Sequence, residues 1–155
     1  MKKQVILLSA VLALSASATL PVAADNSANN SYTNPIERTS LPDPTIIKAD
    51  DGYYYLYATE SIRNLPIYKS KDLVDWTYVG TAFTPETRPQ MVPKGGLWAP
   101  DINRIGNKYV LYYAKSQWGG EWSCGIGVAT ADQPLGPFTD HGKLFLSNEI
   151  GVQNS

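Results

Sequence analysis

The chain has 155 residues, with 13 Lys and Arg against 14 Asp and Glu, which gives a net charge of −1. This balance argues against nucleic acid as a partner, because binding to phosphates needs an excess of basic groups. Hydrophobic residues make up 43% of the chain and charged residues only 17%, so a folded core is expected rather than disorder of the whole chain.

The first segment, residues 1–24, is typical of a cleavable export signal. A pair of lysines precedes an apolar stretch over residues 5–14, and Val22-Ala23-Ala24 fits a cleavage site. The stretch is too short to span a bilayer comfortably, although a buried N-terminal helix would give a similar pattern. We therefore expect a flexible leader over residues 25–37 and a mature protein that is secreted or periplasmic.

Short β-strands separated by turns are predicted for the rest of the chain. These segments are rich in aromatic and β-branched residues and are bounded by Gly, Pro, Asn and Asp. In chain order they are residues 53–59, 66–70, 76–80, 108–114, 124–130 and 143–146. An all-β fold follows, since the chain has 11 Pro and 12 Gly and no long helical periodicity after the leader.

The predicted strands recur as a repeat. Residues 51–59 align with residues 106–114 at an offset of 55, and residues 70–80 resemble residues 130–142. The matched positions in the second pair are Asp72 with Asp132, Trp76 with Phe138 and Gly80 with Gly142. A period of about 40–60 residues with several strands per unit is typical of the blades of a β-propeller. Two unrelated β-meanders with similar turn residues are the alternative.

The repeat also suggests roles for the matched residues. Trp76 and Phe138 occupy the same place in successive repeats, so we expect both to pack in the core. Asp72 and Asp132 are predicted to cap turns. Two blades would leave at least two open faces, because blades are stabilised by the interfaces with their neighbours.

Thiol and metal chemistry are not indicated. Cys124 is the one cysteine and His141 the one histidine, so neither an internal disulfide nor a structural zinc site can form. We interpret Cys124 as a buried residue of a strand rather than a nucleophile paired with His141. The sequence shows no ligand cluster for a metal and implies no cofactor. Four glutamates match no motif, and the sequence predicts no functional role for them. They are Glu60, Glu86, Glu121 and Glu149.

Three motifs in this order and spacing resemble glycoside hydrolase family 43. They are SLPDPTIIKADDGYYYLYAT, SKDLVDWTYVG and GLWAPDINRIGNKYVLYYA, and the later LGPFTDHGKLF and GVQNS are similar to the family too. The resemblance covers residues 38–155 and implies a five-bladed β-propeller of which about the first two blades are present. It also implies a secreted enzyme whose partner is a plant polysaccharide or oligosaccharide containing arabinose or xylose.

The resemblance places the general base at Asp43, in Leu41-Pro42-Asp43-Pro44. In an inverting glycosidase one carboxylate activates a water while an acid on the other side protonates the leaving oxygen, the two standing roughly 6.5–9.5 Å apart. The flanking prolines are expected to hold the backbone of Asp43 extended and rigid. Without the family pattern, Asp43 could equally begin a turn.

Further residues match the sugar-binding positions of the family. Trp98 and Asp101 resemble a wall of the active site, where an indole face can stack on a sugar ring and a carboxylate can accept hydroxyl hydrogen bonds. Trp98 could instead pack in the core. Trp118 and Gly119 match a loop that lines the sugar pocket, although a hairpin tip is an equally good interpretation. The last matches are Asn154 and Ser155.

The resemblance also implies what this stretch does not contain. In the family, an Asp that tunes the acid follows the segment matched by residues 151–155, and the general acid is a Glu of a later blade. We therefore expect a fragment that is inactive alone, since general acid–base assistance is worth typically 100- to 10,000-fold.

Two other functions stay open. One is a non-catalytic sugar-binding propeller that keeps Trp98 and Trp118. The other is a related retaining enzyme that cleaves fructans or sucrose, whose carboxyl groups stand only about 5–5.5 Å apart. Such enzymes usually have Asn before the first Asp, where this chain has Pro42, and this difference favours inversion.

Overall fold

The computed structural model describes residues 33, 40–118 and 120–150, with the side chains of residues 120–122 excepted. The chain divides into two units, Met1–Ser31 and Tyr32–Ser155, and all described residues belong to the second. That described part consists of strands and turns and contains no helix that could cross a membrane. The predicted export signal and leader lie outside it, apart from residue 33.

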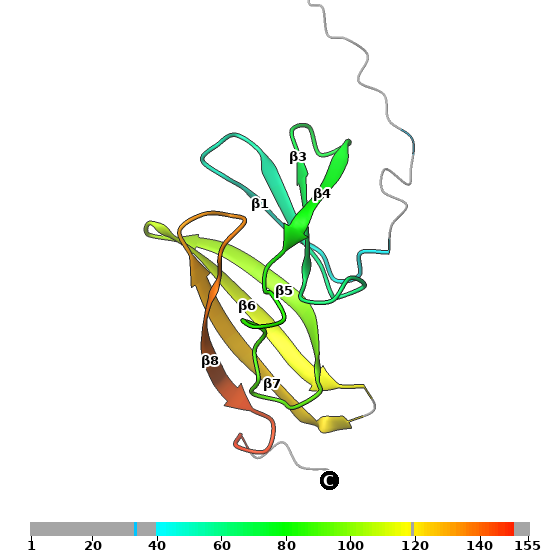
Figure 1. Ribbon diagram of the computed structural model, residues 1–155, viewed down its shortest axis with the longest axis vertical. Coiled ribbons are helices and arrows are strands. Elements are labelled where there is room, and N and C mark those ends of the chain that lie inside the picture. The colour runs from blue at the N-terminus through cyan, green and yellow to red at the C-terminus, as the bar shows by residue number, and fades with distance from the viewer. Residues whose placement is uncertain (1–32, 34–39, 119, 151–155) are drawn as a thin grey trace, which may run out of the picture. The chain divides into compact units, whose positions relative to one another are not determined.

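Two antiparallel sheets of four strands make up the fold (Figure 1). Each sheet is a meander in which consecutive strands are neighbours, in the order β1-β2-β3-β4 and β5-β6-β7-β8. The first contains β1 (Thr45–Lys48), β2 (Tyr54–Tyr57), β3 (Pro66–Ser70) and β4 (Trp76–Thr81). The second contains β5 (Gly96–Ile105), β6 (Lys108–Gln117), β7 (Gly120–Ala131) and β8 (Thr139–Leu146). A four-stranded meander is the unit of a propeller blade, so the predicted all-β class is confirmed.

The six predicted strands are all present, but the sequence reading missed β1 and β5, the first strand of each sheet. Strand β1 is four residues long and follows Pro44, which made it hard to distinguish from a loop. Strand β5 contains Pro100, which cannot donate to a ladder. The structure accommodates Pro100 at a bulge between Trp98 and Asp101, where the register with β6 shifts.

The sequence repeat corresponds to equivalent strands of the two sheets. Residues 51–59 contain β2 and residues 106–114 contain much of β6, each the second strand of its sheet. Asp72 caps its turn as predicted, because its Oδ1 accepts the backbone N–H groups of Val74 and Asp75, both at 2.9 Å. Asp132 differs: its Oδ1 lies 2.6 Å from Lys108 Nζ in a surface ion pair, and this pairing replaces the predicted cap.

Aromatic residues from both sheets form the main hydrophobic cluster. Tyr57 and Phe138 meet edge to face with their centroids 6.2 Å apart, and Phe83 meets Tyr113 in the same way at 5.5 Å. The Tyr57 hydroxyl donates to the backbone oxygen of Pro134, which satisfies its polar end. This cluster joins the two blades and confirms Phe138 as a core residue.

Trp76 belongs to a second, smaller cluster. It packs against the buried residues Leu56, Ala58 and Tyr68 of the first sheet. Its indole N–H donates to Leu73 O at 3.1 Å. The prediction that Trp76 serves packing is therefore confirmed, although its cluster is separate from that of Phe138.

Candidate active site

Asp43 precedes β1, separated from it by Pro44, and its backbone is bent rather than extended. Its φ of 50° lies in the left-handed region, which costs a non-glycine residue roughly 1–3 kcal/mol and persists only when the surroundings over-determine it. The expectation of an extended backbone is therefore wrong. The Pro42 carbonyl turns to accept the Thr59 N–H at 2.9 Å, and aspartate is among the residues that best tolerate this conformation. The side chain of Asp43 is left exposed to solvent.

Thr59, two residues after the end of β2, holds the carboxylate of Asp43. Its Oγ1 lies 2.7 Å from Asp43 Oδ2, and the same Oγ1 lies 2.7 Å from the backbone nitrogen of Ala99. Thr59 is only 5% exposed. One buried hydroxyl therefore connects the predicted base to Ala99 at the bulge of β5. Ala99 lies 40 residues after Thr59 in the chain.

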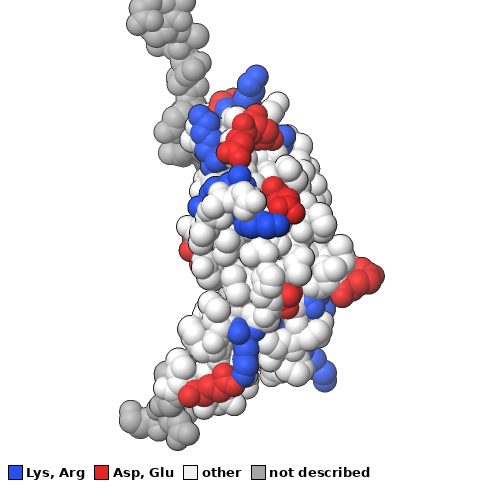
Figure 2. Space-filling view, turned by 90° about the vertical axis from the view of Figure 1, so that its left-hand side faces the viewer, with Lys and Arg blue, Asp and Glu red and all other residues white. Residues whose placement is uncertain are grey.

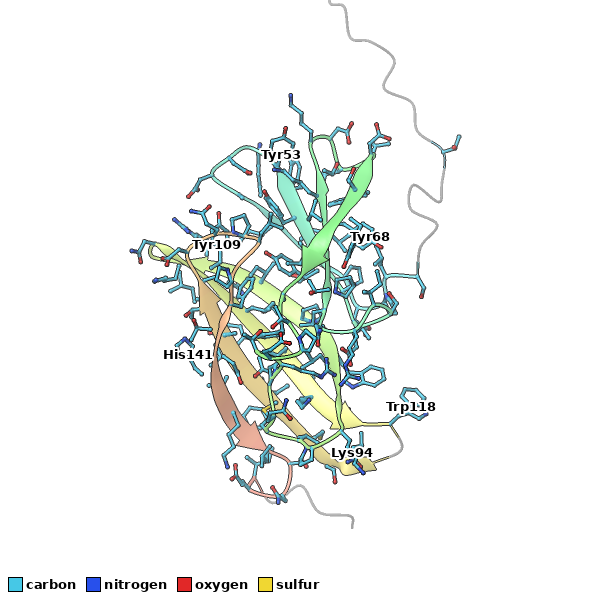
Figure 3. The ribbon with its side chains drawn as sticks, in the orientation of Figure 1. Tyr53, Tyr68, Lys94, Tyr109, Trp118 and His141 are labelled. Carbon is cyan, nitrogen blue, oxygen red and sulfur yellow. The ribbon has the colours of Figure 1, made fainter. Side chains whose placement is uncertain are left out.

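Trp98 and Trp118 are brought together by the β5–β6 pairing and the β6–β7 turn. Their rings stack with centroids 5.6 Å apart and an interplanar angle of 27°. The Trp98 indole is half-buried and its N–H points to Ser116 O at 3.3 Å. Trp118 is 88% exposed and projects from the end of the β6–β7 hairpin (Figure 3). Trp98 is absent from both core clusters, so the stacked pair presents an aromatic surface.

Asp101 lies on β5, beyond the bulge that follows Trp98. It is exposed, and its Oδ2 accepts a hydrogen bond from Asn103 Nδ2 at 3.0 Å. Gly119, Asn154 and Ser155 lie outside the described residues, so their predicted roles in sugar binding stay predictions. Within the described part, no group of three or more His, Cys, Asp or Glu could hold a metal ion.

An ion pair between the half-buried Glu60 and the buried Arg88 supports the candidate site, and no sequence motif pointed to it. The pair is bidentate: Arg88 Nη1 lies 2.7 Å from Glu60 Oε2, and Nη2 lies 2.6 Å from Oε1. Glu60 Oε1 also accepts the Leu97 N–H at 3.0 Å, and the Glu60 N–H donates to Leu97 O at 3.2 Å. Glu60 therefore fixes the start of β5 next to the contact between Thr59 and Ala99.

The charge state of Glu60 follows from these contacts. Burial alone would raise the pKa of Glu60, but the hydrogen bonds from Arg88 and from the backbone N–H groups of Asn64 and Leu97 outweigh burial and lower it. Lys115 is a second buried cation in this region, and its Nζ shares the acceptor Gly95 O with Arg88 Nη2, each at 3.0 Å. Burial and the neighbouring Arg88 charge lower the pKa of Lys115.

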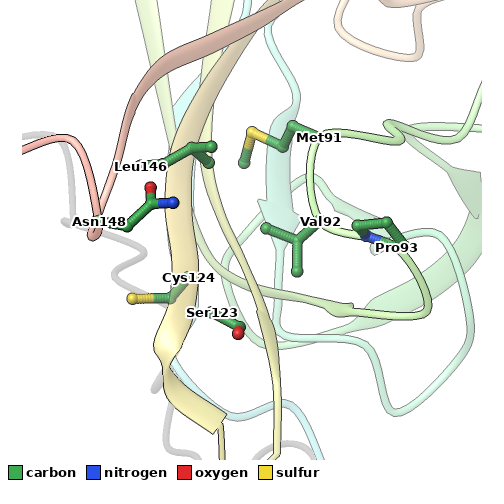
Figure 4. A pocket seen from close by; sticks show the side chains of 7 residues that line it. All are labelled: Met91, Val92, Pro93, Ser123, Cys124, Leu146 and Asn148. Carbon is green, nitrogen blue, oxygen red and sulfur yellow. The ribbon is translucent and has the colours of Figure 1, made fainter.

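Two pockets of the described part are lined by residues other than the predicted site residues. One of about 170 Å³ is lined by Met91, Val92, Pro93, Ser123, Cys124, Leu146 and Asn148 (Figure 4). Its sulfur atoms come from Met91 and Cys124, and it offers no carboxylate. The Nε2 of His141 lies 2.7 Å from Thr130 Oγ1. On the face shown in Figure 2, acidic and basic side chains lie side by side with uncharged surface between them.

The chain belongs to glycosyl hydrolases family 43, whose sequence pattern matches residues 32–154. It is 37% identical over 119 residues to the non-reducing end alpha-L-arabinofuranosidase BoGH43B of Bacteroides ovatus, covering 73% of this chain and 22% of that protein. It is 35% identical over 110 residues to the arabinan endo-1,5-alpha-L-arabinosidase A of Aspergillus niger, covering 68% of this chain and 33% of that protein.

Solved structures give the same family and the fold. The Bacillus subtilis arabinanase Arb43A aligns with a TM-score of 0.62 at 34% identity, covering 70% of this chain and 39% of that one. The Cellvibrio cellulosa alpha-L-arabinanase complexed with arabinohexaose aligns with a TM-score of 0.61 at 30% identity, covering 71% and 36%. The two sheets are thus blades of a five-bladed β-propeller, and the chain spans between about a fifth and two fifths of the length of these relatives.

Proposed function

We propose that this chain is the base-bearing part of a secreted glycoside hydrolase that cleaves arabinan, arabinoxylan or xylan with inversion. Asp43 carries the proposal: an exposed carboxylate on a strained backbone, tied through Thr59 to the strand that bears Trp98. Asp43 removes a proton from water as that water attacks the anomeric carbon, and a carboxylic acid on the opposite side protonates the leaving oxygen. The stacked indoles of Trp98 and Trp118 offer an apolar face to a sugar ring.

The substrate class follows from the relatives. Two proteins at least 35% identical to this chain are named for arabinofuranoside or arabinan cleavage, so arabinose-containing polymers are the first substrates to test. The enzyme expressed from the complete gene should release sugar from linear arabinan, arabinoxylan, xylan or aryl glycosides of arabinose or xylose. Binding of these sugars without any hydrolysis would support the non-catalytic alternative.

Replacing Asp43 tests the role of the base in that enzyme. Asp43→Asn should lower kcat by about 100- to 10,000-fold, the usual contribution of a general base. Asp132→Asn is the matched control, since Asp132 is an exposed aspartate paired with Lys108 on the surface, and it should leave kcat unchanged. An Asp43→Asn variant with the kcat of the unaltered enzyme would rule out Asp43 as the base.

We also propose that residues 25–155 alone do not turn over substrate. The support is that the relatives are about two and a half to four and a half times as long as the part they share with this chain and that the paired-carboxylate mechanism needs an acid as well as a base. Expression of residues 25–155 followed by assay on the same substrates tests this directly. Turnover that Asp43→Asn abolishes would contradict it.

A further inference from the structure

We infer that Thr59 is a positioning residue that orients the base Asp43 and fixes which of its two oxygens takes the proton. This inference rests on the proposed function of Asp43. Thr59 Oγ1 lies 2.7 Å both from Asp43 Oδ2 and from the backbone nitrogen of Ala99. Thr59 itself is 5% exposed, so water does not compete freely for its hydroxyl group.

The direction of these two hydrogen bonds follows from the donors available. The Ala99 N–H can only donate, so Thr59 Oγ1 is its acceptor. A hydroxyl group has a single proton to donate, and Asp43 Oδ2 is the acceptor at 2.7 Å. The result is a chain of donors from Ala99 N–H through Thr59 O–H to Asp43 Oδ2, in which each bond polarises the next.

The same hydroxyl group secures the two strained residues of the site. Asp43 has a φ of 50° and Ala99 a φ of 39°, both in the left-handed region. Such conformations persist only where neighbouring contacts enforce them. Thr59 contacts Asp43 through its carboxylate and Ala99 through its N–H, and its own N–H donates to Pro42 O at 2.9 Å. Three hydrogen bonds of one residue therefore hold both strained backbones.

The chemical consequence is an assignment of the two carboxylate oxygens. Oδ2 is engaged by Thr59, whereas Oδ1 accepts no hydrogen bond from the described residues and Asp43 is exposed. Oδ1 therefore takes the proton of the attacking water. The water oxygen forms the new bond to the anomeric carbon, the glycosidic C–O bond breaks, and the leaving oxygen takes a proton from a carboxylic acid of the enzyme.

Kinetics on the enzyme expressed from the complete gene test the inference with three threonine variants. Thr59→Val keeps the shape of the side chain but removes the hydroxyl, and it should lower kcat about 10- to 100-fold at nearly unchanged KM, as for a misplaced catalytic group. Thr59→Ser keeps the hydroxyl and should restore most of kcat. Thr45→Val is the matched control, since Thr45 Oγ1 accepts the Ile102 N–H of β5 at 3.5 Å without contacting Asp43, and it should leave kcat unchanged.

NMR spectroscopy of the enzyme from the complete gene, labelled with ¹⁵N and ¹³C, tests the hydrogen bonds of Thr59 without requiring turnover. Thr59→Val should shift the NMR signals of both the Ala99 amide and the Asp43 carboxyl carbon, Thr59→Ser should restore them, and Thr45→Val should leave the Asp43 carboxyl carbon in place. If the two signals move together but the complete enzyme hydrolyses no glycoside, the proposed function fails while the hydrogen-bond chain stands. If the enzyme is active and Thr59→Val keeps kcat, or Thr59→Ser is as slow as Thr59→Val, the inference is overturned.

Discussion

At the scale of single residues, the site depends on contacts between distant parts of the chain. Asp43 meets Thr59 over 16 residues of sequence, Thr59 meets Ala99 over 40, and Arg88 meets Glu60 over 28. The first of these places the carboxylate, and the last two fix β5 against the end of β2. Substitution of Thr59, Glu60 or Arg88 should therefore change the position of Asp43 or of β5, even if none of these side chains contacts a sugar.

The Glu60–Arg88 pair gives a prediction about stability. Glu60→Gln should reduce the free energy of unfolding at pH 7 by about 1–3 kcal/mol, because it removes the carboxylate partner of the buried Arg88 charge. Urea unfolding followed by tryptophan fluorescence would measure it. Glu86→Gln is the control, an exposed glutamate in the connection that also bears Arg88, and it should change stability by no more than about 0.5 kcal/mol.

The same pair predicts a pH dependence. The pKa of Glu60 in the folded chain lies below the 4.5 of an ordinary glutamate, so the unfolded chain binds a proton more readily as the pH falls. The stabilisation from Glu60 is therefore complete above about pH 4.5 and is lost as the pH falls through the folded-state pKa. The stability difference between the unaltered chain and Glu60→Gln should shrink in that window. A difference that stays constant down to pH 3 would contradict the assignment.

The sequence predicts some residues of the candidate site and not others. Asp43, Trp98 and Trp118 lie in motifs that the family resemblance picks out, and the structure shows Asp43 exposed and the two indoles stacked. Thr59 and the Glu60–Arg88 pair have no such signal. Their partners lie far away in sequence, at no helical or strand period, so only the packing of two blades reveals them.

At the scale of the elements, the sequence predicted six of the strands and missed the first strand of each sheet. Strand β6 has the sequence KYVLYYAKSQ, and three consecutive residues near its start are buried. Consecutive residues of a strand point to opposite faces, so this pattern is expected for a strand covered on both faces. Strand β5 carries Pro100 at its bulge, and β1 has only four residues after Pro44. These first strands bear or adjoin the predicted site, where a local departure from regular pairing is common.

The contact between β6 and β7 supports a prediction at this scale. Gly127 pairs with Tyr113, and a Cβ on Gly127 would lie 2.3 Å from the Tyr113 hydroxyl oxygen. That hydroxyl donates to Asp140 Oδ1, so the ring cannot move without losing the bond. Gly127→Ala should lower the free energy of unfolding by about 1–3 kcal/mol, measured by urea unfolding. Ser123→Ala, at an exposed position of the same strand, should leave stability within about 0.5 kcal/mol; equal stability of the two variants would contradict the clash.

At the scale of the whole molecule, the packing of the two blades links the proposed base Asp43 through Thr59 to the strand that bears Trp98. Apolar side chains are also exposed on the second sheet, at Leu144, and after it, at Ile150, each 53% accessible. A pocket of about 240 Å³ is lined mainly by Ala114, Ile126 and Phe145 of this sheet and by Ile150, which follows β8. Repeat folds draw stability from contacts between neighbouring units, which agrees with the greater length of the relatives.

The stereochemistry of the first product distinguishes inverting hydrolysis, with Asp43 as base, from retention. Proton NMR during the first minutes of hydrolysis of an aryl α-L-arabinofuranoside by the enzyme from the complete gene should show the β-anomer first, followed by slow mutarotation. With Asp43→Asn neither anomer should form at a comparable rate. First appearance of the α-anomer would show retention, with Asp43 acting as a nucleophile, and would contradict the account.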